Sequence, residues 1–106
     1  PSTPQDLLAY LSADRIMDVR ATAAANPRTP AAALVALASD KSWEVREALA
    51  KNPQLDPQTL EDLAGHWSWM VRAAVAENPH TSAGTLRRLA EDPDQSVQKA
   101  ARSRIH

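Results

Sequence analysis

The chain has no cysteine and no phenylalanine, and among its 106 residues only 2 are glycine and 1 is tyrosine. Without cysteine it can form no disulfide, thiolate metal site, cysteine nucleophile or cysteine-ligated iron–sulfur cluster. Two glycines are too few for a loop that cradles phosphate. The absence of cysteine fits a reducing compartment, so we expect a cytoplasmic protein without a cofactor.

Long hydrophobic runs and a dominant charge are missing as well. No apolar run approaches the roughly 20 residues that a transmembrane helix needs, and no signal-peptide pattern is visible. The 12 Lys and Arg residues nearly balance the 13 Asp and Glu residues, so no long-range field favours nucleic acid or an anionic membrane. Because the chain begins at Pro1 and not at a methionine, we expect it to be part of a longer protein.

Sequence motifs for catalysis are also absent. The residues His66, His80 and His106 show no metal-ligand spacing, and there is no nucleophile elbow. A Ser–His–Asp triad stays open, because its members can come from distant parts of a chain. We identify no catalytic, cofactor-binding or metal-binding residue and expect a protein that is not an enzyme.

The chain does contain a repeated sequence motif, whose three copies are VRATAAANPRT, VREALAKNPQL and VRAAVAENPHT. The three copies begin at Val19, Val45 and Val71, which are 26 residues apart. Columns of leucine, asparagine and proline follow the same step, which is the sign of a repeat architecture. Cutting before each proline of its column gives four ungapped units, 1–26, 27–52, 53–78 and 79–104.

Each unit contains two short helical patterns. In the second unit, TPAAALVALASD is predicted to begin with Thr29 as N-cap and Pro30 at the first helical position. SWEVREALAKNP is predicted to be capped by Ser42 and stopped by Pro53. Helices below about 12 residues barely form alone in water, so neighbouring units must stabilise them. We predict an all-α, right-handed solenoid of four two-helix repeats without strands, forming one domain over 1–106.

The asparagine column lies between the end of a helix and a proline. An amide at Asn26, Asn52 or Asn78 can bond its own turn or the free carbonyls of a neighbouring helix end. We predict a structural ladder and no functional role for these residues.

The repeated pattern resembles the bacterial leucine-rich-repeat variant family, whose units read V-R-x-A-V-A-x-N-P-x-T-P-x-x-x-L-x-x-L-A-x-D. The best-matching stretch comprises Val71, Arg72, Ala74, Val75, Ala76, Asn78, Pro79, Thr81, Leu86, Leu89, Ala90 and Asp92. The resemblance implies pairs of short helices, one α and one often 3₁₀-like, in a right-handed superhelix. Some members carry an iron–sulfur cluster on cysteines of a separate segment, which this cysteine-free chain lacks.

Two departures from the pattern stand out. Asp56–Pro57 stands one residue later than Thr29–Pro30. In the fourth unit Gln98 replaces arginine, and Arg104–Ile105 replaces Asn–Pro, so we expect this unit to end the array with a polar face. We expect a monomer or weak end-to-end self-association.

The candidate partner-binding residues lie in two neighbouring columns. The first holds Met17, Trp43 and Trp69, and the second, three residues later, holds Arg20, Arg46 and Arg72. Trp and Arg are enriched at binding hot spots, and residues three apart are neighbours on a helix. Trp67 stands outside the columns and is expected to be exposed. The predicted surface comprises Trp43, Arg46, His66, Trp67, Trp69 and Arg72.

A structural role is the alternative for the same residues. Trp43 and Trp69 can fill gaps between units, because large aromatics are often partly buried. The arginines can bond an aspartate column of Asp14, Asp40 and Asp92, which His66 interrupts in the third unit.

The function that we predict is a non-enzymatic scaffold whose surface binds another protein or another part of its own longer chain. The alternative is a groove that binds the nucleic-acid backbone, for which the basic residues are Arg28, Arg87, Arg88, Arg102 and Arg104. The balanced total charge disfavours that alternative.

Overall fold

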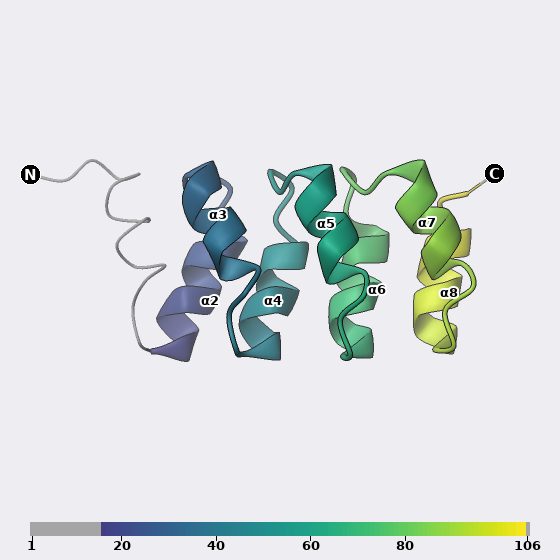
Figure 1. Ribbon diagram of the computed structural model, residues 1–106, viewed down its shortest axis with the longest axis horizontal. Coiled ribbons are helices and arrows are strands. Elements are labelled where there is room, and N and C mark those ends of the chain that lie inside the picture. Colours follow the sequence, from purple (N-terminus) through teal and green to yellow (C-terminus); the bar gives the residue numbers. More distant parts are fainter. Residues whose placement is uncertain (1–15, 106) are drawn as a thin grey trace, which may run out of the picture.

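The computed structural model describes residues 16–105, and within this range the chain forms seven helices and no strand (Figure 1). The helices are α2 (Met17–Ala25), α3 (Ala31–Leu37), α4 (Trp43–Ala50), α5 (Pro57–Leu63), α6 (Trp69–Glu77), α7 (Ala83–Leu89) and α8 (Gln95–Arg102). The prediction of an all-α chain with two helices per repeat is confirmed for these residues. The first helical pattern of the first unit lies outside the described residues.

The helices form two layers of an elongated array (Figure 1). The helices α2, α4, α6 and α8 lie side by side in sequence order and pack directly on one another. The helices α3, α5 and α7 form the second layer, and each packs on the two longer helices that flank it in the chain. This arrangement is the predicted solenoid, in which each unit contacts only its neighbours.

The core repeats with the sequence, because equivalent positions of successive units are buried together. Val45, Val71 and Val97 are fully buried. The side chains of Ala24, Ala50 and Ala76 are also inaccessible; they have no more than a methyl group where neighbouring long helices meet, so the helices can approach closely. The buried leucines of the short helices are Leu34, Leu37, Leu60, Leu63, Leu86 and Leu89.

The short helices are α-helical, so the expectation of a 3₁₀-like partner was wrong within residues 16–105. The amide of Leu60 donates to the carbonyl of Asp56 at 3.1 Å, which is the i to i−4 bond of an α-helix. Leu60, Leu63 and Ala64 are all buried. Their i, i+3, i+4 spacing suits 3.6 residues per turn, whereas a 3₁₀-helix would rotate the third side chain away.

The helix caps differ from two of the predictions. Thr29 does not cap α3; its hydroxyl donates to the carbonyl of Ala23 at 2.6 Å and fastens the preceding helix end. Ser42 does not cap α4 either, because its hydroxyl donates to Oε1 of Glu44. Asp56 does cap α5, accepting from the amide of Thr59 at 3.0 Å. Its helix starts 26 residues after α3, so Asp56 is equivalent to Pro30 and Leu55 to Thr29. The Asp–Pro pair does come one residue later than Thr29–Pro30, and this shift places its aspartate at the N-cap.

The asparagine column forms the predicted ladder between units. The Nδ2 of Asn52 donates to the carbonyls of Ala24 and Asn26, at 2.9 and 3.0 Å. The Nδ2 of Asn78 donates to the carbonyls of Ala50 and Asn52, at 2.7 and 2.8 Å. Each amide thereby satisfies two carbonyls at the end of the preceding long helix. The Oδ1 of each asparagine accepts an amide two residues later, so both expected kinds of bond form together.

The fourth unit replaces these side chains without losing the bonds. Arg104 takes the asparagine position, and its Nη1 donates to the carbonyls of Ala76 and Asn78, at 3.1 and 2.6 Å. Arg102 stands where the other units bury alanine, and it is exposed. The side chains that line a shallow hollow on α8 are Gln95, Gln98, Lys99, Arg102 and Ser103. This end of the array therefore presents polar groups, as expected of a terminal unit.

Candidate functional site

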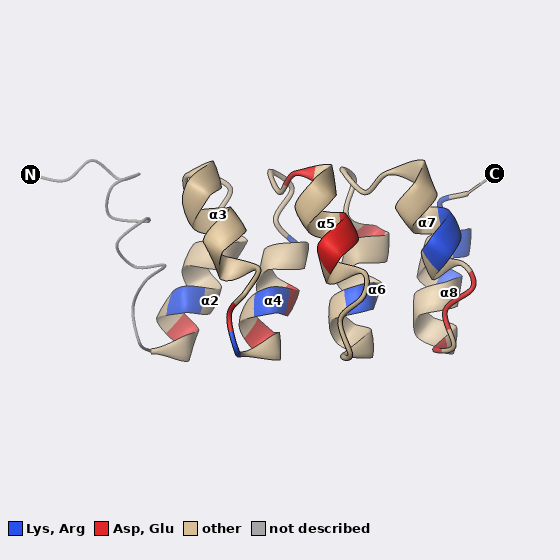
Figure 2. Cartoon of the chain, viewed as in Figure 1, with Lys and Arg blue, Asp and Glu red and all other residues tan. Residues whose placement is uncertain are grey.

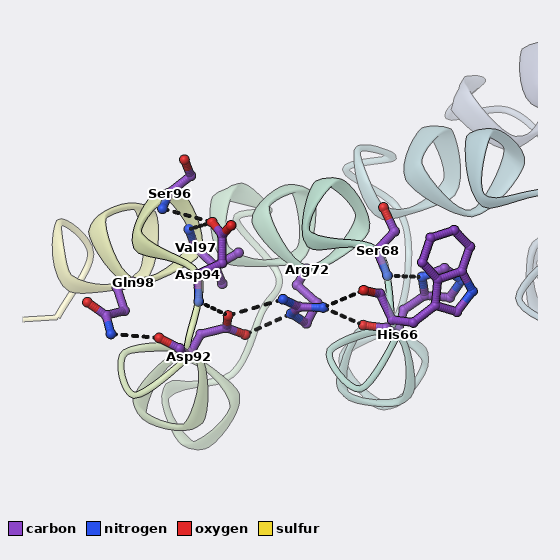
Figure 3. Close-up of polar contacts among 9 residues, drawn as sticks. His66, Ser68, Arg72, Asp92, Asp94, Ser96, Val97 and Gln98 are labelled. Atoms are coloured by element: carbon purple, nitrogen blue, oxygen red, sulfur yellow. Dashed lines mark hydrogen bonds and ion pairs between the residues drawn. The ribbon is translucent and has the colours of Figure 1, made fainter.

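The arginine column ties the loops of consecutive units together, and Arg72 shows the complete arrangement (Figure 3). Its Nε and Nη2 donate to the two carboxylate oxygens of Asp92, at 2.8 and 3.2 Å. Its Nη1 donates to the carbonyls of His66 and Trp67, at 2.8 and 2.9 Å. Oδ1 of Asp92 also accepts the amide of Asp94 at 2.8 Å. One guanidinium thus fixes the loop before its own helix and the loop of the next unit.

Arg20 and Asp40 form a second pair of the same kind. Nε and Nη2 of Arg20 donate to Oδ2 and Oδ1 of Asp40, at 2.7 and 3.1 Å. Burial acts to raise the pKa of Asp40, but the bonds from Arg20 and from the Ser42 amide, with the charges of Arg20 and Arg46, bring it below its usual value. The predicted structural role of the arginine column is thus observed at Arg20 and Arg72, whereas Asp14 lies outside the described residues.

Arg46 breaks the column, although it lies at the equivalent place on its helix; Figure 2 shows a basic band at the same height on α2, α4 and α6. The residue facing it from the next unit is His66, where the other units have aspartate. The side chain of Arg46 makes no hydrogen bond within residues 16–105, and its Nε is shut off from solvent. A positively charged group therefore remains without a hydrogen-bonded carboxylate in an otherwise satisfied column.

His66 preserves only one part of the aspartate's role. Its Nδ1 accepts the amide of Ser68 at 3.0 Å, as aspartate oxygens accept the amides of Ser42 and Asp94 in the other two loops. Nδ1 is therefore unprotonated, and the proton of the neutral ring is on Nε2. Burial lowers the pKa of His66 below its ordinary value of 6.5, and the charges of Arg46 and Arg72 lower it further. The side chain offers Arg46 no anion.

The three tryptophans differ in exposure. Trp43 is half-buried and packs against the core, which favours the structural interpretation of this residue. Trp67 is 75% exposed and Trp69 is 46% exposed. The rings of His66 and Trp67 lie 5.1 Å apart with planes tilted by 32°. The predicted exposure of Trp67 is confirmed.

The six residues predicted from the sequence thus separate into two groups. Arg72 is committed to loop carbonyls and Asp92, and Trp43 to packing. The other four are Arg46, His66, Trp67 and Trp69, and we call them the Arg46 site. Arg46 lies close enough to His66 for its charge to affect that ring, His66 contacts Trp67, and Trp69 begins α6 two residues later.

Within residues 16–105, no three His, Cys, Asp or Glu side chains gather in a way that could hold a metal ion. No described helix is both long and apolar enough to cross a bilayer.

The lowered pKa of His66 predicts a pH-dependent stability. Above pH 6.5 the ring is neutral in both the folded and the unfolded chain. Below 6.5 the unfolded chain binds the proton more readily, so the free energy of unfolding should fall as the pH decreases from 6.5 toward the lower folded-state pKa. Urea denaturation between pH 7.5 and pH 5 measures this dependence.

His66→Asn is the matched control, because an asparagine oxygen can still accept the Ser68 amide but does not titrate. It should flatten the curve in this range. Asp40 and Asp56, whose pKa values lie below 3.8, lose their stabilising contribution only at lower pH. An equally steep curve in the variant would show that another group is responsible.

Comparison with known proteins agrees with the repeat. Residues 17–42, 43–66 and 69–94 match the family described as leucine rich repeat variant. The two residues left between the last two segments are Trp67 and Ser68, so the match is interrupted at the Arg46 site. No curated protein sequence matches the chain.

A solved structure described as "a leucine-rich repeat variant with a novel repetitive protein structural motif" has the same fold. It aligns with a TM-score of 0.78 and 31% sequence identity over 98% of this chain and 42% of the other. The chain therefore spans less than half the length of that protein. Three matched segments, the common fold and the ladder that repeats with them lead to one conclusion: the chain belongs to the leucine-rich repeat variant family.

Proposed function

We propose that this helical repeat scaffold binds another protein and that the Arg46 site is the centre of the binding surface. The observation that carries the proposal is the state of Trp67. Its indole is 75% exposed, whereas its backbone is held on both sides. Arg72 bonds its carbonyl and that of His66, and His66 bonds the amide of Ser68. A large aromatic side chain on a fixed backbone loses little entropy when a partner covers it.

Comparison between the repeats shows that Trp67 is not required for stacking. The equivalent positions hold Lys41 and Pro93, and both of these are exposed. Burying an indole side chain is strongly favourable, and within this fold the Trp67 ring stays in solvent. Tryptophan and arginine are also the residues most enriched among binding hot spots. These features support a contact surface for a partner at this loop.

The arrangement of charge favours a protein over nucleic acid. Figure 2 shows acidic residues on α5 between the uncharged α3 and the basic α7, so no continuous basic strip follows the short helices. Arg104 is bonded to two carbonyls of the preceding unit. Phosphate affinity needs several cations on one face, and the remaining exposed arginines are distributed between α7, α8 and the distant loop at Arg28.

The proposal predicts that Trp67→Ser weakens partner binding while the fold persists. Truncating a hot-spot aromatic should lower the affinity at least about tenfold. The free energy of unfolding should change by less than about 0.5 kcal/mol, because the side chain is mostly in solvent. The measurement is quantitative capture from an extract of the source cells on immobilised wild type and variant, followed by titration of the purified captured protein.

Val35→Ser is the matched surface control, because Val35 is an exposed apolar residue, 51% accessible, on α3 in the other layer. It should leave capture unchanged. Equal capture by wild type and by Trp67→Ser would contradict the proposal, as would a captured species whose binding is lost after nuclease treatment.

A further inference from the structure

We propose that the Arg46 site binds a carboxylate of the protein partner, either an acidic side chain or a chain terminus, through the Arg46 guanidinium. The inference rests on the proposed function and specifies the chemistry of its partner. Two of the three equivalent arginines in the described units already bind a carboxylate in this way, and Arg46 is the one whose carboxylate is missing.

The first support is the unsatisfied state of the guanidinium. Nε of Arg46 is buried and has no hydrogen-bond partner, whereas the terminal nitrogens are not sealed from solvent. The Arg46 guanidinium makes no hydrogen bond within the described residues. It does not bond the carbonyls of Asp40 and Lys41, which are the equivalents of those that Arg72 bonds. The terminal nitrogens form a planar pair of donors that a carboxylate can approach from solvent.

The second support is that the neighbouring groups also lack an acceptor for this space. Asp40 is nearest in the column, but both of its oxygens are bonded to Arg20 and one also accepts the Ser42 amide. His66 uses Nδ1 for Ser68, so its free nitrogen is a donor. Arg46, His66 and Arg72 place three basic side chains around the site, and the charges of Arg46 and Arg72 both reach His66. An incoming anion would give the terminal nitrogens of Arg46 an acceptor without displacing an existing bond.

The third support is the apolar surface beside His66, the ring that the Arg46 charge reaches. Trp67 contacts His66 and exposes most of its indole, and Trp69 begins the next helix. A carboxylate attached to an apolar body could pair with Arg46 and cover the Trp67 ring at the same time. We choose a carboxylate over a phosphate because carboxylate is the anion that both neighbouring arginines bind, and Asp40 close by disfavours a doubly charged anion.

The test uses benzoate, benzamide and acetate as probes on the whole chain. Benzoate and benzamide share their shape and differ in charge, and acetate lacks the apolar ring. Binding is followed by NMR at the arginine Nε–H signals and at the indole N–H signals of the three tryptophans, which single Trp→Phe variants assign. Benzoate should shift the Arg46 and Trp67 signals saturably, acetate should bind more weakly, and benzamide should shift neither.

Two variants separate the charge from the ring. Arg46→Met should lower benzoate affinity at least about tenfold, because a charge-assisted pair is lost. Trp67→Ser should reduce benzoate affinity to that of acetate. The Arg72 Nε–H signal should not shift, because its carboxylate is already present.

His66→Asp provides a test from within the protein. An aspartate at this position should pair with Arg46 as Asp40 and Asp92 pair with their arginines, so the thermal unfolding midpoint should rise and benzoate should no longer bind. Trp67 stays exposed in this variant, so a loss of binding cannot be attributed to loss of the aromatic surface.

Three outcomes would overturn the carboxylate proposal: benzamide binding as well as benzoate, inorganic phosphate binding more tightly than benzoate, or His66→Asp binding benzoate like the wild type. The protein-binding proposal is tested separately. If Trp67→Ser loses partner capture while Arg46→Met and His66→Asp retain it, the partner binds the aromatic surface without a carboxylate, and only the further inference fails.

Discussion

Asp92→Ala should lower the free energy of unfolding by about 3–5 kcal/mol, because removing one partner of a buried ion pair leaves the other charge uncompensated. The side chains of Asp92 and Arg72 are only 6% and 15% exposed. The substitution frees Nε and Nη2 of Arg72 and also the amide of Asp94. Urea denaturation of the variant and the wild type at pH 7 measures the difference.

Two variants locate the cause of that loss. Glu47→Ala removes an ion pair between a half-buried glutamate and the exposed Lys51, in which the two atoms are 3.4 Å apart. It should cost no more than about 0.5 kcal/mol. Asp92→His copies the arrangement at position 66, where a ring nitrogen accepts the loop amide. It should cost less than alanine, because the Asp94 amide keeps an acceptor. If Asp92→Ala cost as little as Glu47→Ala, the loop pair would not contribute to stability.

The overall architecture could be predicted from the sequence because the same constraint is repeated in each unit. A short helix cannot persist alone, so residues equivalent between units must lie in equivalent environments. The buried Val45, Val71 and Val97 illustrate this, since their column alone indicates which face of each long helix points into the core. The period therefore predicted the stack of two-helix repeats and the asparagine ladder.

The caps were less predictable because a threonine between two helices can bond either of them. Its hydroxyl can accept an amide of the following helix or donate to a carbonyl at the end of the preceding one. Threonine is a favoured N-cap residue. The hydroxyl of Thr29 instead donates to the carbonyl of Ala23 at the end of the preceding helix, and the hydroxyl of Thr81 donates to that of Val75. Leu55 fills the same buried position without a hydroxyl. A cap prediction considers only the local helix, whereas in a solenoid the preceding helix end competes for the same hydroxyl.

The candidate site was visible in the sequence only as an irregularity. His66 in the aspartate column indicated that something differed there, and the structure shows that the consequence falls on Arg46, 20 residues earlier. That spacing is the one that joins Arg20 to Asp40 and Arg72 to Asp92. The sequence columns could not reveal it, because they align residues 26 apart and do not show which columns touch. The division between Trp43 and Trp67 likewise depends on three-dimensional packing.

Asn78→Asp should lower the free energy of unfolding by about 3 kcal/mol, because two buried carbonyls lose their donors and a buried unsatisfied group costs about 1–3 kcal/mol. Asn78 is 2% exposed, and its Nδ2 bonds the carbonyls of Ala50 and Asn52. Aspartate keeps the shape of the side chain and the acceptor for the His80 amide. A loss in this variant therefore reflects the two lost donors and the buried carboxyl that replaces them, and not a cavity. Thermal and urea unfolding should agree on its size.

Asn26→Asp is the control that separates the ladder from the turn. Within residues 16–105 the side chain of Asn26 accepts the amide of Arg28 and donates to no carbonyl, so the same substitution should cost less than about 1 kcal/mol. If the turn bond alone mattered, both variants would be tolerated. If helix ends must be satisfied by the following unit, only Asn78→Asp is severe. Unequal losses from the same substitution would show that stability resides between the repeats, so a loop side chain such as Trp67, which is mostly in solvent, contributes little to it.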